Sequence, residues 1–262
     1  DTIENTIKEA VKAVRRGYRE IVLTGVNIGD FGRSSGESFT ELLAALEKVE
    51  GLERLRMGSI EPNLLTDEII SMAASSRVIM PHFHIPLQSG SDEVLDLMKR
   101  RYTTGLFSSR ISAIREKMPH AFIGVDVIAG SNGETEALFR ESYDFINSLE
   151  ISRLHAFPYS ERSGTQALKI SFKVPLEIRK LRTQQYINLS EKKLRSFYTR
   201  NLDSVRIVLF EEDTGRDRME GFTDNYIRVE SRFQPEFINN LKRVKLLSVL
   251  PDGNVSGEIV TD

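Results

Sequence analysis

The sequence predicts an α/β protein in which a partial parallel (β/α) barrel of the TIM type is followed by a small antiparallel β-barrel. Through Pro158, five short apolar runs alternate with amphipathic helical patterns, as βαβ units require. A polar or glycine-rich turn follows each of these runs. After Val205 the pattern changes to short alternating runs without a long helix between them, which is typical of a small barrel.

Apolar residues three or four positions apart, together with capping residues at the helix starts, indicate where the helices lie. In the first helix, Ile3, Ile7, Val11 and Val14 share one side, and Gly17 follows as the stop residue. Further helices are expected at 40–49, 66–74, 92–98, 107–118 and 136–149.

The five apolar runs predict strands at 20–24, 55–60, 82–87, 122–129 and 154–158. A complete barrel needs eight such units, so the barrel is expected to be partial or to lack its first strand. The turns after the strands read TGVN, SIEPN, QSGS, AGSNGE and PYSERSGT. Because the carboxyl ends of parallel strands meet at one edge of a sheet, these turns predict a single binding site there.

The chain is expected to divide into a partial barrel at 1–170, a basic connecting helix at 171–204 and the small barrel at 205–262. Although the whole chain has a net charge of −2, the stretch from Lys169 to Arg200 holds nine Lys and Arg residues and two Glu residues. Such a run is either a solvated helix face or a strip that contacts RNA phosphates. On the second interpretation, Lys192, Lys193 and Arg195 are the candidate contacts.

The composition excludes several kinds of chemistry. The chain contains no cysteine, so it has neither a disulfide nor a thiolate ligand for a metal. No apolar run is long enough to span a bilayer, and no signal peptide is recognisable. We therefore expect a cytoplasmic protein without a membrane partner.

Titratable side chains within or directly after the strands are the first candidates for a site. His82 and His84 share one face of their strand, but a metal would need a third ligand, and a His-x-His pair is more often a packing feature. Asp126 interrupts an apolar strand, so it either faces a polar barrel mouth or caps a neighbouring loop. Glu61 is either a hydrogen-bond acceptor for a ribose or amino group, or a plain turn residue.

Two further patterns favour a ligand only weakly. Gly130, Gly133 and Glu134 belong to a glycine-containing turn, but neither a P-loop lysine nor a G-x-G-x-x-G pattern accompanies them, so no nucleoside triphosphate site is expected. Arg100 ends a predicted helix, where a cation complements the helix dipole in any case.

In the predicted C-terminal barrel, aromatic and basic side chains lie close together in the sequence. Phe222, Tyr226 and Arg228 form this pattern. Alternation of this kind suits a surface that stacks nucleic-acid bases and neutralises phosphates. The pattern is short, so it is a weak indication of RNA binding by itself.

Long motifs of this sequence resemble those of one enzyme family. EIVLTGVNIGDFG, SIEP, HFHIPLQSGSDEVLDLMKRRYT, IGVDVIAGSNGETE and LHAFPYSERSGT occur in the order and spacing of the radical S-adenosylmethionine methylthiotransferases. LTGVNIG-x-FG is most similar to the branch that acts on threonylcarbamoyladenosine in tRNA, and GFTDNYIRV resembles the centre of a TRAM domain, an RNA-binding β-barrel. Ser131-Asn132 departs from the Phe-Pro that is usual in the family, so a differently shaped loop is expected there.

The resemblance implies insertion of a methylthio group at C2 of threonylcarbamoyladenosine beside the anticodon by radical chemistry, with tRNA as partner and an unknown sulfur donor. The cofactors implied are S-adenosylmethionine and two 4Fe-4S clusters, which cysteines hold in the family. Since the chain has none, we expect most of the radical domain plus the TRAM domain, without the first strand and the CxxxCxxC loop. Such a piece would bind neither cluster and would be inactive alone.

The residue patterns described above and the resemblance together assign roles to residues. Those expected to contact S-adenosylmethionine follow the strands: Thr24, Gly25, Asn27, Ser59, Glu61, His84, Gln88, Ser89, Asp126, Gly130, Phe157 and Tyr159. Those expected to contact RNA are basic or aromatic: Arg100, Lys192, Lys193, Arg195, Phe222, Tyr226 and Arg228. No residue is expected to bind a metal.

Two other functions remain open at this point. A methylthiotransferase that modifies an aspartate of a ribosomal protein would share the fold but not the substrate. A catalytically inert RNA-binding protein that natively lacks cysteine belongs to a different class.

Overall fold

The computed structural model describes residues 1–213 and 217–260. The N-terminal part of these residues contains parallel strands that follow one another in chain order, and we call this part the half-barrel. Its strands are β1 Glu20–Leu23, β2 Arg54–Met57, β3 His82–His84, β4 Phe122–Ala129 and β5 Arg153–Pro158. β1 pairs with β2, and β4 lies between β3 and β5. Main-chain hydrogen bonds from the Leu55 amide to the Val78 carbonyl (2.8 Å) and from the Ile60 amide to the His84 carbonyl (3.1 Å) join the two groups. The predicted partial parallel barrel is confirmed.

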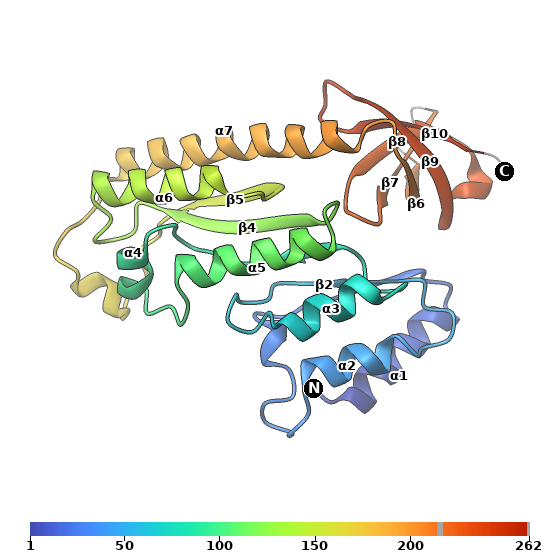
Figure 1. Ribbon diagram of the computed structural model, residues 1–262, viewed down its shortest axis with the longest axis horizontal. Helices are drawn as coiled ribbons and strands as arrows, with labels where there is room; N and C mark the ends of the chain where they lie inside the picture. The colour runs from blue at the N-terminus through green and yellow to red at the C-terminus, as the bar shows by residue number, and fades with distance from the viewer. Residues whose placement is uncertain (214–216, 261–262) are drawn as a thin grey trace.

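Helices connect these strands and cover the outer side of the half-barrel (Figure 1). They are α1 Ile3–Arg15, α2 Phe39–Leu46, α3 Asp67–Ser75, α4 Asp92–Leu97, α5 Thr104–Lys117 and α6 Glu136–Ser148, with short 3-10 turns at Ile28–Asp30 and Gln166–Lys169. Hydroxyl caps set most of the starts: the Thr66 and Thr103 side chains accept hydrogen bonds from the amides of Ile69 and Leu106. The cap at Thr103 is why α5 begins three residues before the predicted Phe107.

The two faces of the strands differ in character because successive side chains point to opposite sides. Leu55, Met57, Phe83 and Val125 are fully buried against the helices and form the core. The alternate positions face the inside of the half-barrel and are mostly polar: Glu20, Arg54, Arg56, His82, His84, Asp126, Arg153 and His155. The inner face therefore carries the candidate chemistry.

A long helix, α7 Leu176–Asn201, packs against β5 and lies beside α6 before leading into the C-terminal barrel (Figure 1). It starts at Leu176 rather than at the predicted Ser171 because Pro175 occupies its N-cap position. Tyr186, Leu189 and Phe197 bury its inner side.

The C-terminal barrel consists of β6 Val205–Asp213, β7 Arg218–Thr223, β8 Arg228–Arg232, β9 Asn240–Val249 and β10 Val255–Ile259, with a 3-10 turn at Pro235–Phe237. It is closed in the order β10-β8-β7-β6-β9. The predicted small antiparallel β-barrel is confirmed, and it contains one parallel pairing, that of β10 with β8. A ring of five strands that alternate in direction necessarily closes on one parallel pair.

Buried arginines fix this barrel to the amino ends of the half-barrel strands. The Arg54 guanidinium donates to the Phe222 carbonyl (2.9 Å), and that of Arg56 donates to the carbonyls of Asp224 (2.9 Å) and Thr223 (2.7 Å). Both side chains are only 2% exposed, and the Glu20 carboxylate accepts a hydrogen bond from Arg56 Nε at 2.7 Å. Burial, and then the neighbouring charge of Arg56, lower the pKa of Arg54 to about 10.

The described part of the chain contains no helix that is both long and apolar enough to cross a bilayer.

Candidate functional site

A row of hydrogen-bonded side chains lies on the inner face near the carboxyl ends of three neighbouring strands. Ser59 Oγ is 2.8 Å from His84 Nδ1, and His84 Nε2 is 2.8 Å from Asp126 Oδ1. The strand register explains the row, since Ser59 bridges to His84 and the next strand brings Asp126 alongside. With both ring nitrogens engaged, the orientation of the His84 imidazole is fixed.

His155 extends this row, although it was not among the candidates from sequence. It lies opposite Asp126 in the β4–β5 register, and its ring centroid is 5.6 Å from that of His84. Burial and then the positive charge of Arg153 lower the pKa of His155, which favours a neutral ring. Inward alternation along β5 was the available signal, but it becomes usable only once the register with β4 is known.

Unused hydrogen-bonding groups border the row. Among the described residues, neither the second carboxylate oxygen of Asp126 nor the side-chain amide of Gln88 has a hydrogen-bond partner. The backbone of Gln88 has a φ of 70°. The main-chain amide of Gln88 donates a hydrogen bond to the Asp126 carbonyl (2.8 Å), and the main-chain carbonyl of Gln88 accepts one from the Ile128 amide (2.9 Å). Gln88 thus lies shortly after β3 and forms a bridge with Val127 of β4 at this edge of the sheet.

The loops after β1 and β2 are joined to each other. Asn27 Oδ1 accepts a hydrogen bond from the Glu61 amide (3.2 Å), and the Ile28 amide donates to the Ser59 carbonyl (3.0 Å). Glu61 in turn forms an ion pair with Arg100 at 3.4 Å. The sequence assigned Glu61 to the cofactor and Arg100 to RNA, whereas the structure brings the two together.

Thr24, Gly25 and Asn27 line a cavity of about 520 Å³ between their loop, α1 and α2. None of Ser59, His84 and Asp126 is among the residues that line it. The predicted cofactor residues therefore occupy two adjoining regions of the same edge rather than one continuous pocket.

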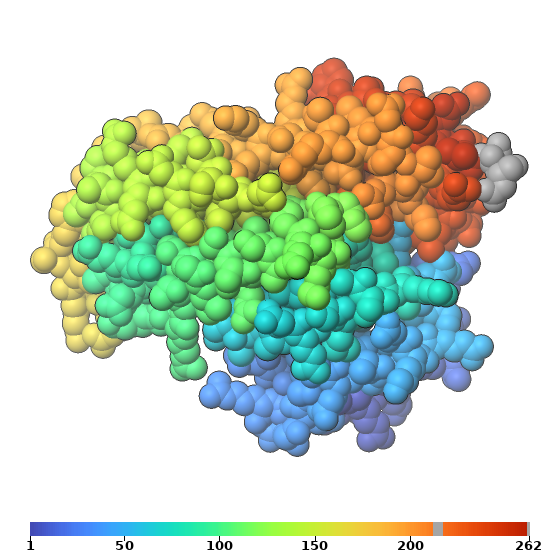
Figure 2. Space-filling model, viewed as in Figure 1, coloured from blue at the N-terminus to red at the C-terminus, as the bar shows by residue number. Residues whose placement is uncertain are grey.

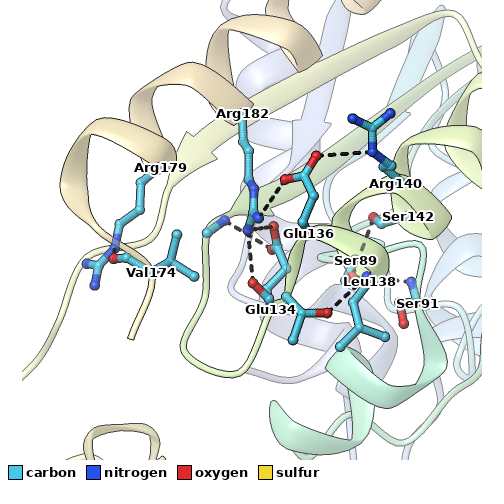
Figure 3. Close-up of polar contacts among 12 residues, drawn as sticks. Ser89, Ser91, Glu134, Glu136, Leu138, Arg140, Ser142, Val174, Arg179 and Arg182 are labelled. Atoms are coloured by element: carbon cyan, nitrogen blue, oxygen red, sulfur yellow. Dashed lines mark hydrogen bonds and ion pairs between the residues drawn. The ribbon is translucent and has the colours of Figure 1, made fainter. Parts of the chain in front are cut away.

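The side chain of Ser89 is directed into the packing against α6 (Figure 3). It is 1% exposed, and its hydroxyl lies 3.5 Å from Ser142 Oγ. Ser142 accepts a hydrogen bond from the Gly90 amide (2.7 Å) and is 2.8 Å from the Tyr186 hydroxyl. Ser89 therefore belongs to the packing contacts that hold the QSGS turn against α6.

The loop that contains Gly130 is anchored to α7 by a buried ion pair (Figure 3). Glu134 Oε2 accepts from the Gly130 amide (3.0 Å), and Arg182 donates to Glu134 Oε1 (2.9 Å) and pairs with Glu136 (3.1 Å). Burial raises the pKa of Glu134, while the charge of Arg182 opposes this shift. Gly130 has a φ of 76°, and an added Cβ would lie 2.5 Å from Cγ of Arg179. The glycine is thus required by the approach of α7.

Aromatic side chains lie at the end of β5 on the other side of the row. Phe157 is 52% exposed and pairs in register with Ile128. The Tyr159 ring lies under the Arg179 guanidinium, 5.2 Å from ring centroid to Cζ. Phe157 therefore offers an accessible apolar surface beside polar groups.

The three basic candidates on α7 have different surroundings. Lys192 and Arg195 are exposed. Lys193 donates to the carbonyls of Asn147 (3.0 Å) and Leu149 (2.8 Å) at the end of α6, and burial lowers its pKa to about 8. The basic stretch is therefore not one uniform strip, since Arg179 and Arg182 are also buried.

The aromatic candidates of the C-terminal barrel lie in its contact with the half-barrel. Phe222 and Tyr226 stack on each other at 4.8 Å between centroids, and Tyr226 packs against His82 at 4.3 Å. Burial and then the charge of Arg56 lower the pKa of His82 to about 3, as expected of a packed neutral imidazole. Arg228 forms an ion pair with Glu220. The arrangement differs from the open stacking surface expected from the sequence.

A half-barrel with a polar row at the carboxyl ends of its parallel strands defines this chain as an enzyme-like (β/α) fold with its site at that edge. Residues 1–146 match the family model of the Radical SAM superfamily, and the chain belongs to that superfamily. Among solved structures, it is similar in fold to the radical S-adenosylmethionine methyltransferase TsrM from Kitasatospora setae. The TM-score is 0.51 and the identity 16%, over 60% of this chain and 31% of that one.

Sequence relatives extend over nearly all of the chain. Threonylcarbamoyladenosine tRNA methylthiotransferase MtaB from Bacillus subtilis is 37% identical over 93% of this chain and 55% of its own length. MtaB from Aquifex aeolicus is 35% identical over 92% of this chain and 58% of its own length. tRNA-2-methylthio-N(6)-dimethylallyladenosine synthase from Carboxydothermus hydrogenoformans is 32% identical, with 93% and 56% covered. The chain spans somewhat more than half the length of these relatives.

The superfamily implies S-adenosylmethionine and a 4Fe-4S cluster. The residues of this chain suit the first of these groups but not the second. The unused carboxylate oxygen of Asp126 and the amide of Gln88, next to the exposed ring of Phe157, suit the hydroxyls and purine of a nucleoside. A cluster requires thiolates, and the sequence supplies no cysteine. No step through a cluster can therefore be assigned to these residues.

Proposed function

We propose that this chain serves a tRNA methylthiotransferase, which inserts a methylthio group at C2 of threonylcarbamoyladenosine next to the anticodon in the cytoplasm. The single observation that carries this proposal is the 37% identity to MtaB, which extends over 93% of the chain and so includes the half-barrel, α7 and the C-terminal barrel. On this proposal, the thiolates for the two clusters come from cysteines that this sequence does not contain, and the chain alone is inactive.

The carboxyl edge of the half-barrel is the proposed S-adenosylmethionine site. When bound, this cofactor supplies the methyl group and the radical chemistry. Asp126 and Gln88 bind the ribose hydroxyls, and His84 holds Asp126 in place through the 2.8 Å hydrogen bond. Phe157 contacts the adenine, and Asn27 orients the loop beside the methionine end through its bond to the Glu61 amide.

The remaining parts contribute RNA contacts in this proposal. We assign 1–170 to the radical domain, 171–204 to a connecting helix and 205–262 to a TRAM-type RNA-binding unit. Exposed Lys192 and Arg195 on α7, together with Arg228 on the barrel, are among the charged groups available to phosphates. Tyr226 positions the barrel, because its ring packs against His82, and Phe222 supports Tyr226 by stacking on its ring within the barrel.

Mass spectrometry of nucleosides from total tRNA, with and without the gene that encodes this chain, tests the proposal. Loss of the 2-methylthio group from threonylcarbamoyladenosine alone is the expected result. Loss from dimethylallyladenosine instead would favour the second candidate, which the 32% identity to the synthase of that modification supports. An unchanged nucleoside profile would contradict both and favour a ribosomal-protein substrate or a non-catalytic RNA-binding role.

A further inference from the structure

A second polar cavity lies at the end of the half-barrel opposite the proposed cofactor site. Its volume is about 440 Å³, and it is bounded by the end of α5, the end of α7 and the start of β6. Figure 2 shows the green end of α5 beside the orange end of α7 on this side of the molecule. The charged or titratable residues that line it are Arg115, His120, Glu150, Arg200 and Arg206.

The lining carries more positive than negative charge. Arg206 is neutralised by Asp224 at 3.2 Å. Arg115 donates to three main-chain oxygens, those of Glu150 (2.9 Å), Pro119 (3.0 Å) and Ala121 (2.7 Å), none of which is a carboxylate. These bonds fix its guanidinium in place, and the Glu150 carboxylate, which also lines the cavity, offsets part of its charge.

Arg200 adds a further positive charge, so the lining keeps an excess of cations over the single Glu150 carboxylate. It is exposed, and among the described residues its side chain has no hydrogen-bond or ion-pair partner. Burial, followed by the charge of Arg200, lowers the pKa of Arg115 to about 10. Burial, followed by the charge of Arg206, also lowers the pKa of His120. The cations thus repel one another, and a bound anion would relieve this repulsion.

We propose that this cavity binds a backbone phosphate of the RNA substrate, with Arg200 and the fixed Arg115 as its cationic partners. Guanidinium groups recognise phosphate through paired N–H donors. The eight residues of β4, at about 3.3 Å each, separate this end from the carboxyl edge by roughly 25 Å. A mononucleotide cannot span that distance, whereas a folded RNA with one nucleotide at the edge can place a distant phosphate here.

The identity of the RNA rests on the proposed function, but the cavity can be tested separately. In the 262-residue chain, Arg200→Glu removes an exposed, unpartnered cation and should leave the fold intact. Lys180→Glu on the same helix is the control, roughly 30 Å away at 1.5 Å per residue. Fluorescence anisotropy with an anticodon stem-loop RNA over a series of KCl concentrations measures both affinity and salt dependence.

Arg200→Glu should lower the RNA affinity about tenfold and reduce the slope of log affinity against log salt by about 1, while Lys180→Glu should change the affinity less than about twofold. Equal affinity and slope for Arg200→Glu and the wild type would overturn the proposal. If the nucleoside profile is unchanged but Arg200→Glu still weakens RNA binding, only the identity of the proposed RNA substrate is overturned.

The titration of His120 by NMR gives an independent readout. Its ring faces the charges of Arg115, Arg206 and Asp224, and a bound phosphate should raise its pKa because the imidazolium is then favoured. A rise on addition of the RNA supports the site. If the RNA leaves the pKa of His120 unchanged, the assignment of the cavity to RNA is overturned. The same conclusion follows if inorganic phosphate shifts this pKa and the RNA does not.

Discussion

The two ends of the half-barrel use the same kind of inward-facing polar side chain for different purposes. At the carboxyl end, His84 and Asp126 remain 25% and 22% exposed and keep hydrogen-bonding capacity. At the amino end, Arg54 and Arg56 are 2% exposed, and carbonyl oxygens of the C-terminal barrel occupy their guanidinium groups. Access to solvent and ligand, rather than residue type, separates a candidate site from a docking contact.

The largest effect is expected from breaking the amino end. Arg56→Met would leave the Thr223 and Asp224 carbonyls without their donor and would leave Glu20 buried with a poorer partner. Removal of one member of a buried ion pair costs about 3–5 kcal/mol, so the free energy of unfolding measured in urea should fall by that amount. Arg19→Met, in a partly exposed pair with Glu53, should cost less than about 1 kcal/mol. Equal losses would disprove the docking role of Arg56.

A smaller loss of stability is expected at the carboxyl end, in the loop that follows β4. Gly130→Ala must accept both a φ of 76° and a Cβ that lies 2.5 Å from Arg179 Cγ. Gly17→Ala has a φ of 90° but no atom within 4 Å, so it isolates the conformational cost of about 1–2 kcal/mol. Overpacking should add a further 1–3 kcal/mol, roughly, at Gly130. Similar melting temperatures for the two variants would show that α7 can move away.

Function rather than stability should respond when the polar row is broken. Asp126→Asn keeps the shape but removes the carboxylate charge. The affinity for S-adenosylmethionine measured by calorimetry should therefore fall by a factor of about ten to a hundred, as expected when one charge-assisted hydrogen bond of about 1.5–3 kcal/mol is lost. Asp144→Asn, on the exposed side of α6, should leave the titration unchanged. Identical titrations for both variants would remove Asp126 from the site.

An effect that is confined to alkaline pH is expected at Lys193. Its pKa in the folded chain is about 8, below the ordinary value of 10.5, so folding opposes its protonation. This penalty is fully present below about pH 8 and disappears as pH rises toward the ordinary value. The wild type should therefore gain stability relative to Lys193→Met between pH 8 and 10 in urea unfolding curves. Exposed Lys192→Met should show no such trend, and a parallel trend would refute the assignment.

Local patterns were enough to find most elements. The strand predicted at 122–129 is the observed β4, and the helix predicted at 66–74 corresponds to α3, which Thr66 caps, since alternation and side-chain caps involve neighbouring residues. The sequence identified Ser59, His84 and Asp126 only as separate candidates at the same edge, and not as a hydrogen-bonded row. Its hydrogen bonds depend on the register of three strands, which no local pattern specifies.

Sequence by itself determined the alternation of strands and helices, the edge where polar turns gather and the absence of thiolates, because each depends on residue type and short spacing. Only the tertiary structure decided that Arg54 and Arg56 hold the C-terminal barrel, that Tyr226 packs against His82, and that His155 joins Asp126. These contacts join residues far apart in the chain. The same polar side chain is a ligand group or a buried anchor according to what the fold places beside it.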